Sequence, residues 1–376
     1  MTIENRNLNI PNISVTALVE RLAALYSGAV ENGIPFSDLP TPFLWGPTGI
    51  GKSSGVKQLA ERLGKLTGKT VNVIDVRLFM FTPSDLRGIP FKDEKKNPDD
   101  ELRFTVWLLP KIFLMDTSDN VINIIFLDEL SAAPQSVQAA AYQITEDRRI
   151  GEHILPSNCI VIAAGNRTTD QSVSFKMPKA LANRLMHFNV QSDMDSWKKW
   201  AYENGIDSRI IGFLEFENSM FCVTPASSDL AFPSPRIWMY VSNVLKALDS
   251  PKDLRSCHDL LSGCVGIDTA VAFESWCGFC DSLPSVDDII RGTCRVYPPT
   301  QDALYALTTS IVSAVHERRE HIGPDELDNI CSYASRFPSD FAMSLFKDLN
   351  AMDDIRLTLM KCPSMKDWLS RNMKRL

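Results

Sequence analysis

The sequence has 376 residues, 44% of them hydrophobic and 23% charged, which is typical of a folded chain with room for two or three domains. This composition excludes a disordered chain, a collagen and a coiled-coil rod. Asp and Glu number 46 against 39 Lys and Arg, so the net charge of −7 argues against bulk electrostatic binding to nucleic acid, although a local basic pore could still bind it.

The sequence shows no pattern of export or membrane crossing. The nearest apolar burst, residues 159–164, is far shorter than the about 18 residues that a membrane helix needs. The first residues are polar and lack the pattern of a signal peptide. The nine cysteines have no framework spacing. We therefore expect a cytoplasmic protein with reduced thiols and no membrane contact.

The first half of the chain alternates strand and helix patterns, which predicts a parallel sheet with helices between its strands. Three of the strand patterns are apolar at nearly every position, as in strands buried on both faces. Helices are predicted near 52–66 and 134–146, and the charged residues 92–103 are expected to form a loop or hairpin tip. The predicted strands are 42–45, 71–78, 123–127, 159–164 and 187–190.

The second half has almost no strand pattern. Beyond about residue 195 the sequence predicts helices, separated by Pro and Gly breaks near 232–235, 297–299 and 322–324. We therefore expect an α/β domain followed by an all-α region.

A phosphate-binding motif follows the first predicted strand and opens the first predicted helix. It matches G-x-x-x-x-G-K-[ST] and consists of Gly46, Pro47, Thr48, Gly49, Ile50, Gly51, Lys52 and Ser53. The glycines let consecutive N–H groups point at an anion, and the helix N-terminus adds a favourable dipole. Lys52 is predicted to reach the β- and γ-phosphates of a nucleotide, and Ser53 to bind Mg²⁺. The alternative is a glycine-rich turn without a ligand.

Two carboxylates, Asp128 and Glu129, end the apolar strand 123–127. Neighbouring strand side chains point to opposite sides, so the two acids can take different roles. Asp128 is predicted to hold Mg²⁺, and Glu129 to polarise the attacking water in phosphoryl transfer. A solvated strand end is the alternative, but the upstream phosphate-binding motif favours nucleotide hydrolysis.

These motifs together resemble those of AAA+ ATPases, specifically the MoxR-like branch, over about residues 15–300. The resemblance implies a P-loop NTPase (AAA+) fold, in which a parallel sheet is sandwiched by helices and followed by an all-α lid and a C-terminal helical extension. The implied domains are residues 1–195 (nucleotide-binding), 196–300 (lid) and 301–376 (extension). Residues 83–88 are similar to an Asp-Leu-x-Gly element of that family.

The resemblance also implies roles for polar residues that follow the fourth strand. Asn166 resembles sensor 1, which orients the lytic water with Glu129. Arg184, which ends the segment 178–184, resembles an arginine finger that reaches the nucleotide of a neighbouring subunit; Arg167 is a second candidate. Arg236, next to Pro235 at the start of a helix, resembles sensor 2. Each of these could instead be an ordinary capping or surface residue.

The resemblance implies ATP and Mg²⁺ as cofactors. An arginine finger in trans requires a head-to-tail contact, which closes into a ring or opens into a spiral, and the resemblance favours a hexameric ring. It also implies remodelling of a protein substrate, with a von Willebrand factor A domain protein as partner. Two alternatives stay open: an ATP-gated scaffold that hydrolyses slowly, and a nucleic-acid-linked NTPase motor. No residue that reads the base is evident, so ATP rather than GTP follows from the resemblance alone.

Cys277 and Cys280 have the spacing of a metal or redox pair. A zinc site would require further paired ligands with turns between them. The pair lies in an apolar segment with helical spacing, where cysteines behave as small hydrophobic residues. Two packed thiols are therefore the preferred interpretation.

Overall fold

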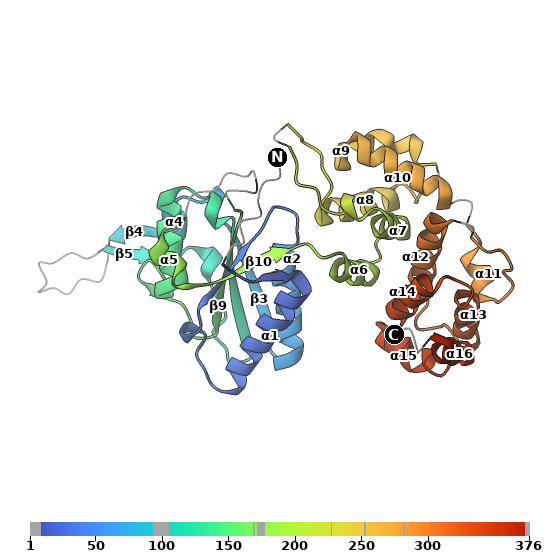
Figure 1. Cartoon of the computed structure of the whole chain (residues 1–376). Helices are drawn as coiled ribbons and strands as arrows, with labels where there is room; N and C mark the ends of the chain where they lie inside the picture. The colour runs from blue at the N-terminus through green and yellow to red at the C-terminus, as the bar shows by residue number, and fades with distance from the viewer. Residues whose placement is uncertain are drawn as a thin grey trace, which may run out of the picture. The chain divides into compact units, whose positions relative to one another are not determined.

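The computed structural model describes residues 9–92, 105–167, 170, 177–226, 228–251, 253–280, 283–298 and 300–372. The chain divides into two compact units, Met1–Ser192 and Asp193–Leu376. We call these the sheet unit and the helical unit and describe each by itself (Figure 1).

The sheet unit is built on a six-stranded parallel sheet in the order β1-β10-β2-β9-β6-β3. All five predicted strands are confirmed, and their ends lie within two residues of the predicted ones. The sixth strand, β1, was not predicted, because three residues are too few to show a pattern. The strands are β1 Asn12–Ser14, β2 Thr41–Trp45, β3 Thr70–Arg77, β6 Val121–Asp128, β9 Cys159–Gly165 and β10 Leu185–Gln191.

Helices cover both faces of this sheet, which is why β6 and β9 are buried along almost their whole length. Ile125 and Leu127 of β6 share a hydrophobic cluster with Val137 of α4 (Gln135–Tyr142) on one face. Alternate residues such as Ile124 point to the opposite face, where α1 (Val15–Glu31) and α2 (Lys52–Thr67) lie side by side (Figure 1). The α/β sandwich expected from the sequence is therefore confirmed.

Two short antiparallel hairpins interrupt the alternation. One joins β4 (Ile89–Lys92) to β5 (Thr105–Leu108), and the other joins β7 (Arg149–Ile150) to β8 (His153–Ile154). The first brackets the charged segment that was expected to be a loop or hairpin tip; residues 93–104 lie outside the described part of the chain.

The predicted helix near 134–146 is two elements rather than one. The α-helix α4 ends at Tyr142 and continues as a five-residue π-helix, Gln143–Asp147. Arg148 then ends the segment in a left-handed conformation with φ 53°. Two further short helices of the sheet unit are α3 Pro83–Arg87 and α5 Lys179–Ala182.

The described residues after Gln191 form helices and loops without a strand, as predicted for the second half. The helices are α6 Met194–Glu203, α7 Ser208–Phe216, α8 Pro235–Ala247, α9 His258–Val265, α10 Ile267–Cys280, α11 Val286–Ile290, α12 Gln301–Glu317, α13 Pro324–Ala334, α14 Ser339–Asn350, α15 Asp353–Leu359 and α16 Pro363–Asn372. Among the described residues, no helix combines the length and the apolar composition needed to cross a membrane.

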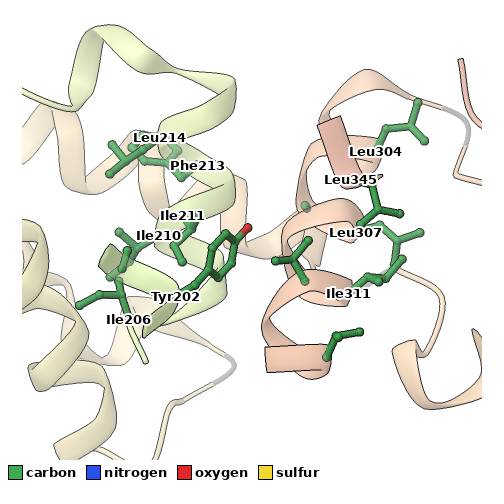
Figure 2. Close-up of a cluster of buried hydrophobic side chains, with 14 of the residues drawn as sticks. Tyr202, Ile206, Ile210, Ile211, Phe213, Leu214, Leu304, Leu307, Ile311 and Leu345 are labelled. Atoms are coloured by element: carbon green, nitrogen blue, oxygen red, sulfur yellow. The ribbon is translucent and has the colours of Figure 1, made fainter. Parts of the chain in front are cut away.

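One hydrophobic cluster extends through the helical unit from Trp197 in α6 to Trp368 in α16. Near its centre α7 packs against α12, and Figure 2 shows the isoleucines of α7 opposite the apolar side chains of α12. Gly212 permits this approach, because an added Cβ would lie 2.7 Å from the hydroxyl oxygen of Thr309. Cys277 is buried in the same cluster. The cluster extends across residue 300, where the lid was expected to end, and that subdivision stays a prediction.

Candidate active site

The carboxyl ends of the central strands bring the predicted motifs together. Trp45, the last residue of β2, is in register with Gly165 at the end of β9, and Leu127 of β6 is in register with Ala163 of β9. The loop after β2, the acids at the end of β6 and the residue after β9 therefore meet at one edge of the sheet. Open parallel sheets bind their ligands at this edge.

The loop 46–53 has the backbone of an anion-binding turn. Gly46, Gly49 and Gly51 all have positive φ, and Gly51 caps the N-terminus of α2. A Cβ on Gly46 would lie 2.8 Å from the carbonyl oxygen of Val190, so this first position also requires glycine for space. Ile50 is buried beside it and anchors the loop.

Lys52 lies inside this loop with 8% of its surface exposed. Its Nζ donates hydrogen bonds to the carbonyl oxygens of Gly46 and Pro47, the latter at 2.9 Å, and to Oδ1 of Asn166 at 3.0 Å. Burial makes an ammonium group costly unless it is hydrogen-bonded. The loop therefore holds the lysine head group among oxygen atoms at the position predicted for phosphate.

Ser53 and Asp128 are joined directly. The Ser53 hydroxyl donates to Oδ2 of Asp128 at 2.8 Å. The other carboxylate oxygen of Asp128 accepts from the backbone N–H of Glu129 at 2.9 Å. Both predicted Mg²⁺ ligands thus lie together, although 75 residues separate them in the sequence.

Glu129 adopts a left-handed backbone conformation, with φ 57°. This conformation is uncommon for a residue other than glycine, and such strain is concentrated at active sites. The turn therefore lies immediately after β6, at the residue that follows Asp128.

Asn166 links the loop to the end of β9. Its Oδ1 accepts from Lys52, and its Nδ2 donates to the hydroxyl of Thr48 at 3.3 Å. Ser131, which the sequence analysis did not single out, fixes the backbone of Asn166: the Ser131 hydroxyl accepts from the Asn166 N–H at 2.8 Å and donates to the Asn166 carbonyl at 2.9 Å. The only sequence signal for Ser131 is its position just after the two acids.

Asp75 on β3 is a second residue that the sequence analysis missed. Burial raises the pKa of the Asp75 carboxyl, and the negative charge of Asp128 raises it further, while Arg77 and Lys57 oppose the shift. The edge strand β3 therefore adds a third carboxylate to the electrostatic environment of the site. It was missed because Asp75 lies within a predicted strand rather than after one.

The predicted arginines lie outside this cluster. Arg184 follows α5, with 54% of its side chain exposed, and Nη1 contacts Oε2 of Glu146 at 2.7 Å. Arg167 is engaged inside the sheet unit by Asp170, at 2.9 Å, and by the side-chain oxygen of Asn189.

Arg236 belongs to the other unit. It is exposed in the first turn of α8, a helix that begins at Pro235 with the Ser234 side chain as its N-cap. The motif that suggested sensor 2 is thus a helix start, as expected.

The residues at the strand ends fit a triphosphate with Mg²⁺. Mg²⁺ takes oxygen ligands and is commonly held by one or two carboxylates together with phosphate oxygens. Ser53 and Asp128 supply a hydroxyl and a carboxylate at one point, and Lys52 supplies a positive charge beside them.

Comparison with protein families agrees with this geometry. Residues 42–191 match the family model described as "ATPase family associated with various cellular activities (AAA)". Residues 42–191 are an AAA domain. The match spans the sheet unit from β2 to the end of β10, and so contains the loop 46–53, both acids, Asn166 and Arg184.

Several solved structures are similar to this chain. PCH-2 from C. elegans is 14% identical, with 71% of this chain and 69% of that chain covered and a TM-score of 0.34. A RuvB variant from Thermotoga maritima is 14% identical, with 84% and 89% covered and a TM-score of 0.35. ORC2 from Aeropyrum pernix is 12% identical, with 97% of each chain covered and a TM-score of 0.38. No curated protein matches. These TM-scores are low, and the AAA match describes residues 42–191 alone.

Proposed function

We propose that the AAA domain hydrolyses ATP with Mg²⁺ at the subunit interfaces of a ring. The observation that supports this most is the 2.8 Å contact between the Ser53 hydroxyl and the Asp128 carboxylate, beside the 3.0 Å contact between Lys52 and Asn166. A binding turn alone needs none of the groups after β6 and β9. Their convergence on the loop supports phosphoryl transfer rather than binding only.

Each polar residue of the cluster has a role in this proposal. Ser53 and Asp128 hold Mg²⁺, which when bound neutralises charge on the phosphates. Lys52 exchanges its contacts with loop carbonyls for the β- and γ-phosphates. Glu129 accepts a hydrogen bond from the attacking water, and Asn166 fixes the direction of that water.

The positive charge that arginine side chains supply to the nucleotide comes from residues outside the cluster. Arg184 is exposed, at the end of α5, and we assign it to the γ-phosphate that a neighbouring subunit binds. Because the finger belongs to one subunit and the nucleotide to the next, the contact is head-to-tail. Such a contact closes into a ring or opens into a spiral, and the ring is the form we propose. Arg236 is the sensor 2 candidate from the helical unit.

We further propose that the chain is MoxR-like, forms a hexamer, and remodels a protein substrate together with a von Willebrand factor A domain partner. The sequence elements at 83–88, 166, 184 and 236 support this assignment by their resemblance to that branch. ATP-driven movement of the helical unit would supply the work.

The test is phosphate release and oligomer size for the wild type, Glu129→Gln and Arg184→Ala. Glu129→Gln keeps nucleotide binding and ring formation but stops turnover, because the amide accepts protons poorly. Arg184→Ala loses about 10³-fold in turnover, because the transition-state charge is unneutralised, while the nucleotide affinity changes by only about threefold.

Mixing Glu129→Gln with Arg184→Ala tests which subunit supplies the acids and which supplies the finger of one site. A site whose acids come from the Arg184→Ala subunit and whose finger comes from the Glu129→Gln subunit is complete, so mixed rings recover turnover. Normal hydrolysis by Arg184→Ala alone, or no recovery on mixing, would contradict the trans assignment. Absence of magnesium-dependent ATP binding by the wild type would contradict the proposed function itself.

A further inference from the structure

The backbone that carries Arg184 is fixed from two sides. Its N–H donates to the carbonyl of Leu181 in α5, and β10 begins at the next residue. The ring of His187 bridges the base of this turn: Nδ1 accepts from the indole N–H of Trp45 at 3.0 Å, and Nε2 lies 2.8 Å from the carbonyl oxygen of Ala182. An indole only donates, so the imidazole is neutral and its Nε2–H donates to Ala182. Only the Arg184 side chain is left to be positioned.

The backbone that carries Glu146 is also fixed. Glu146 lies in the π-helix Gln143–Asp147, a type of element found often at functional sites. On one side of it the carbonyl of Thr145 accepts from the buried hydroxyl of Thr41 in β2 at 2.9 Å. On the other side Arg148 donates to two carbonyl oxygens of the segment before β2, at 3.0 and 3.2 Å.

The contact between the two side chains is short, but it contributes little to stability. Nη1 of Arg184 and Oε2 of Glu146 are 2.7 Å apart, and the side chains are 54% and 33% exposed. Exposed ion pairs contribute about 0–1 kcal/mol, since water and salt screen them. The contact engages one guanidinium nitrogen, and the group carries further N–H donors on Nε and Nη2. The backbone that carries each side chain is fixed, and the contact between the two side chains is weak but directional. This combination indicates that the contact positions Arg184 rather than stabilises the fold.

We propose that Glu146 is the positioning residue of the finger: it holds Nη1 of Arg184 so that the remaining donors meet the γ-phosphate of the adjoining subunit. The inference rests on the proposed trans role of Arg184. An unrestrained arginine side chain carries about 2 kcal/mol of rotamer entropy, and restraint before the contact forms reduces what is lost at the transition state. The effect is therefore on turnover and not on nucleotide affinity.

The first experiment compares single variants of the full chain. Glu146→Ala lowers kcat about tenfold, with KM for ATP within about twofold, because a misplaced group costs rate rather than binding. Glu146→Gln retains most of the rate, since its amide oxygen still accepts from Nη1. Asp147→Ala is the matched control, because it removes the next carboxylate of the same π-helix, which is also exposed, and leaves kcat unchanged.

The second experiment places Glu146→Ala in either subunit of a mixed ring. When Glu146→Ala is combined with Glu129→Gln, it lies in the subunit that donates the finger. Rings that mix this double variant with Arg184→Ala turn over about tenfold more slowly than rings that mix Glu129→Gln with Arg184→Ala, which is the loss expected in rings of Glu146→Ala alone. When Glu146→Ala is combined with Arg184→Ala, it lies in the subunit that donates the acids. Rings that mix this double variant with Glu129→Gln turn over as fast as rings that mix Arg184→Ala with Glu129→Gln. A structural role of Glu146 would lower turnover from either subunit.

The outcomes that overturn the inference are distinct from those that overturn the proposed function. Wild-type or faster turnover by Glu146→Ala, a loss in the Asp147→Ala control of the same size, or equal losses from both subunits would show that Glu146 does not position the finger. If Arg184→Ala itself turns over normally, the trans assignment fails first and the inference fails with it. If Glu146→Ala does not fold, Glu146→Gln decides the matter: its thermal midpoint stays near that of the wild type, and a rate as low as that of Arg184→Ala contradicts the role of the hydrogen bond.

Discussion

Each unit of the molecule contains a buried lysine, and the two are equally shielded from solvent. Lys52 in the sheet unit and Lys198 in the helical unit both have 8% of their surface exposed. The oxygens that accept from Lys52 include two backbone carbonyls and the amide of Asn166. Lys198 instead lies between two carboxylates, Glu215 and Asp348, and contacts Asp348 at 2.9 Å.

The partners of Lys198 form a closed charge network between three helices. Burial alone would lower the pKa of the Lys198 ammonium, but Glu215 and Asp348 raise it above its ordinary value. Burial raises the pKa of both acids despite the lysine. The hydroxyl of Tyr202 is buried close to the same carboxylates, and their charge adds to the effect of burial in raising its pKa.

The two lysines differ in what their displacement would leave behind. Carbonyl and amide oxygens can be exchanged for phosphate oxygens without leaving an isolated charge behind. Displacing Lys198 would leave two buried carboxylates uncompensated, so that network is fixed. We therefore expect substitution of Lys52 to affect ligand binding and substitution of Lys198 to affect folding.

The largest expected effect is on the stability of Lys198→Ala. Removing one partner of a buried ionic network costs about 3–5 kcal/mol, because the remaining charges lose their compensation. Denaturant unfolding followed by tryptophan fluorescence is the measurement. The exposed neighbour Lys199, substituted by Ala, is the control and changes the unfolding free energy by less than about 0.5 kcal/mol. Equal stability of the two variants would show that the network has no structural role.

The second effect is on nucleotide affinity in Lys52→Ala. Loss of the ammonium weakens ATP binding about 30- to 100-fold, which corresponds to about 2–3 kcal/mol and to a charge-assisted hydrogen bond. Calorimetry with Mg²⁺-ATP measures the change, and the thermal midpoint without nucleotide stays near that of the wild type. Lys65→Ala, an exposed position in the last turn of the same helix, is the control. Unchanged ATP affinity in Lys52→Ala would contradict phosphate binding at this loop.

The sequence could predict the sheet unit because its signals are local. The strands around Asn123 and Cys159 are apolar runs, and the loop at Gly46 follows one strand and opens one helix, so each element is visible in a short window. That Asn166 would act at the same site as Asp128 and Lys52 was implied by the family resemblance, and the register of β2, β9 and β6 brings the three residues together.

Contacts between distant segments could not be predicted in this way. Ser131 and Asp75 have no motif of their own, and only the register of β3, β6 and β9 brings them to the site. The salt bridge from Lys198 to Asp348 spans 150 residues, and the π-helix looks like a continuation of α4 in the sequence. Nothing in the order of residues reveals which charged side chains a helical core will enclose.

The smallest expected effect is a pH dependence in the helical unit. Burial raises the pKa values of Glu215 and Asp348 above 4.5 and 3.8, so above those values the native state binds more protons than the unfolded state. Their contribution to the unfolding free energy therefore falls as pH rises from about 4 toward neutrality. Asp348→Asn removes one titrating group, and Asp340→Asn, exposed on the same helix, is the control. Unfolding measured by tryptophan fluorescence should show that the wild type loses stability relative to Asp348→Asn over this range but not relative to Asp340→Asn. If the wild type instead gained stability relative to Asp348→Asn, the attraction of Lys198 would outweigh the effect of burial on the pKa values of the two carboxyls. Lys52 and Lys198 would then differ in how strongly their partners bind them and not in the cost of burying them.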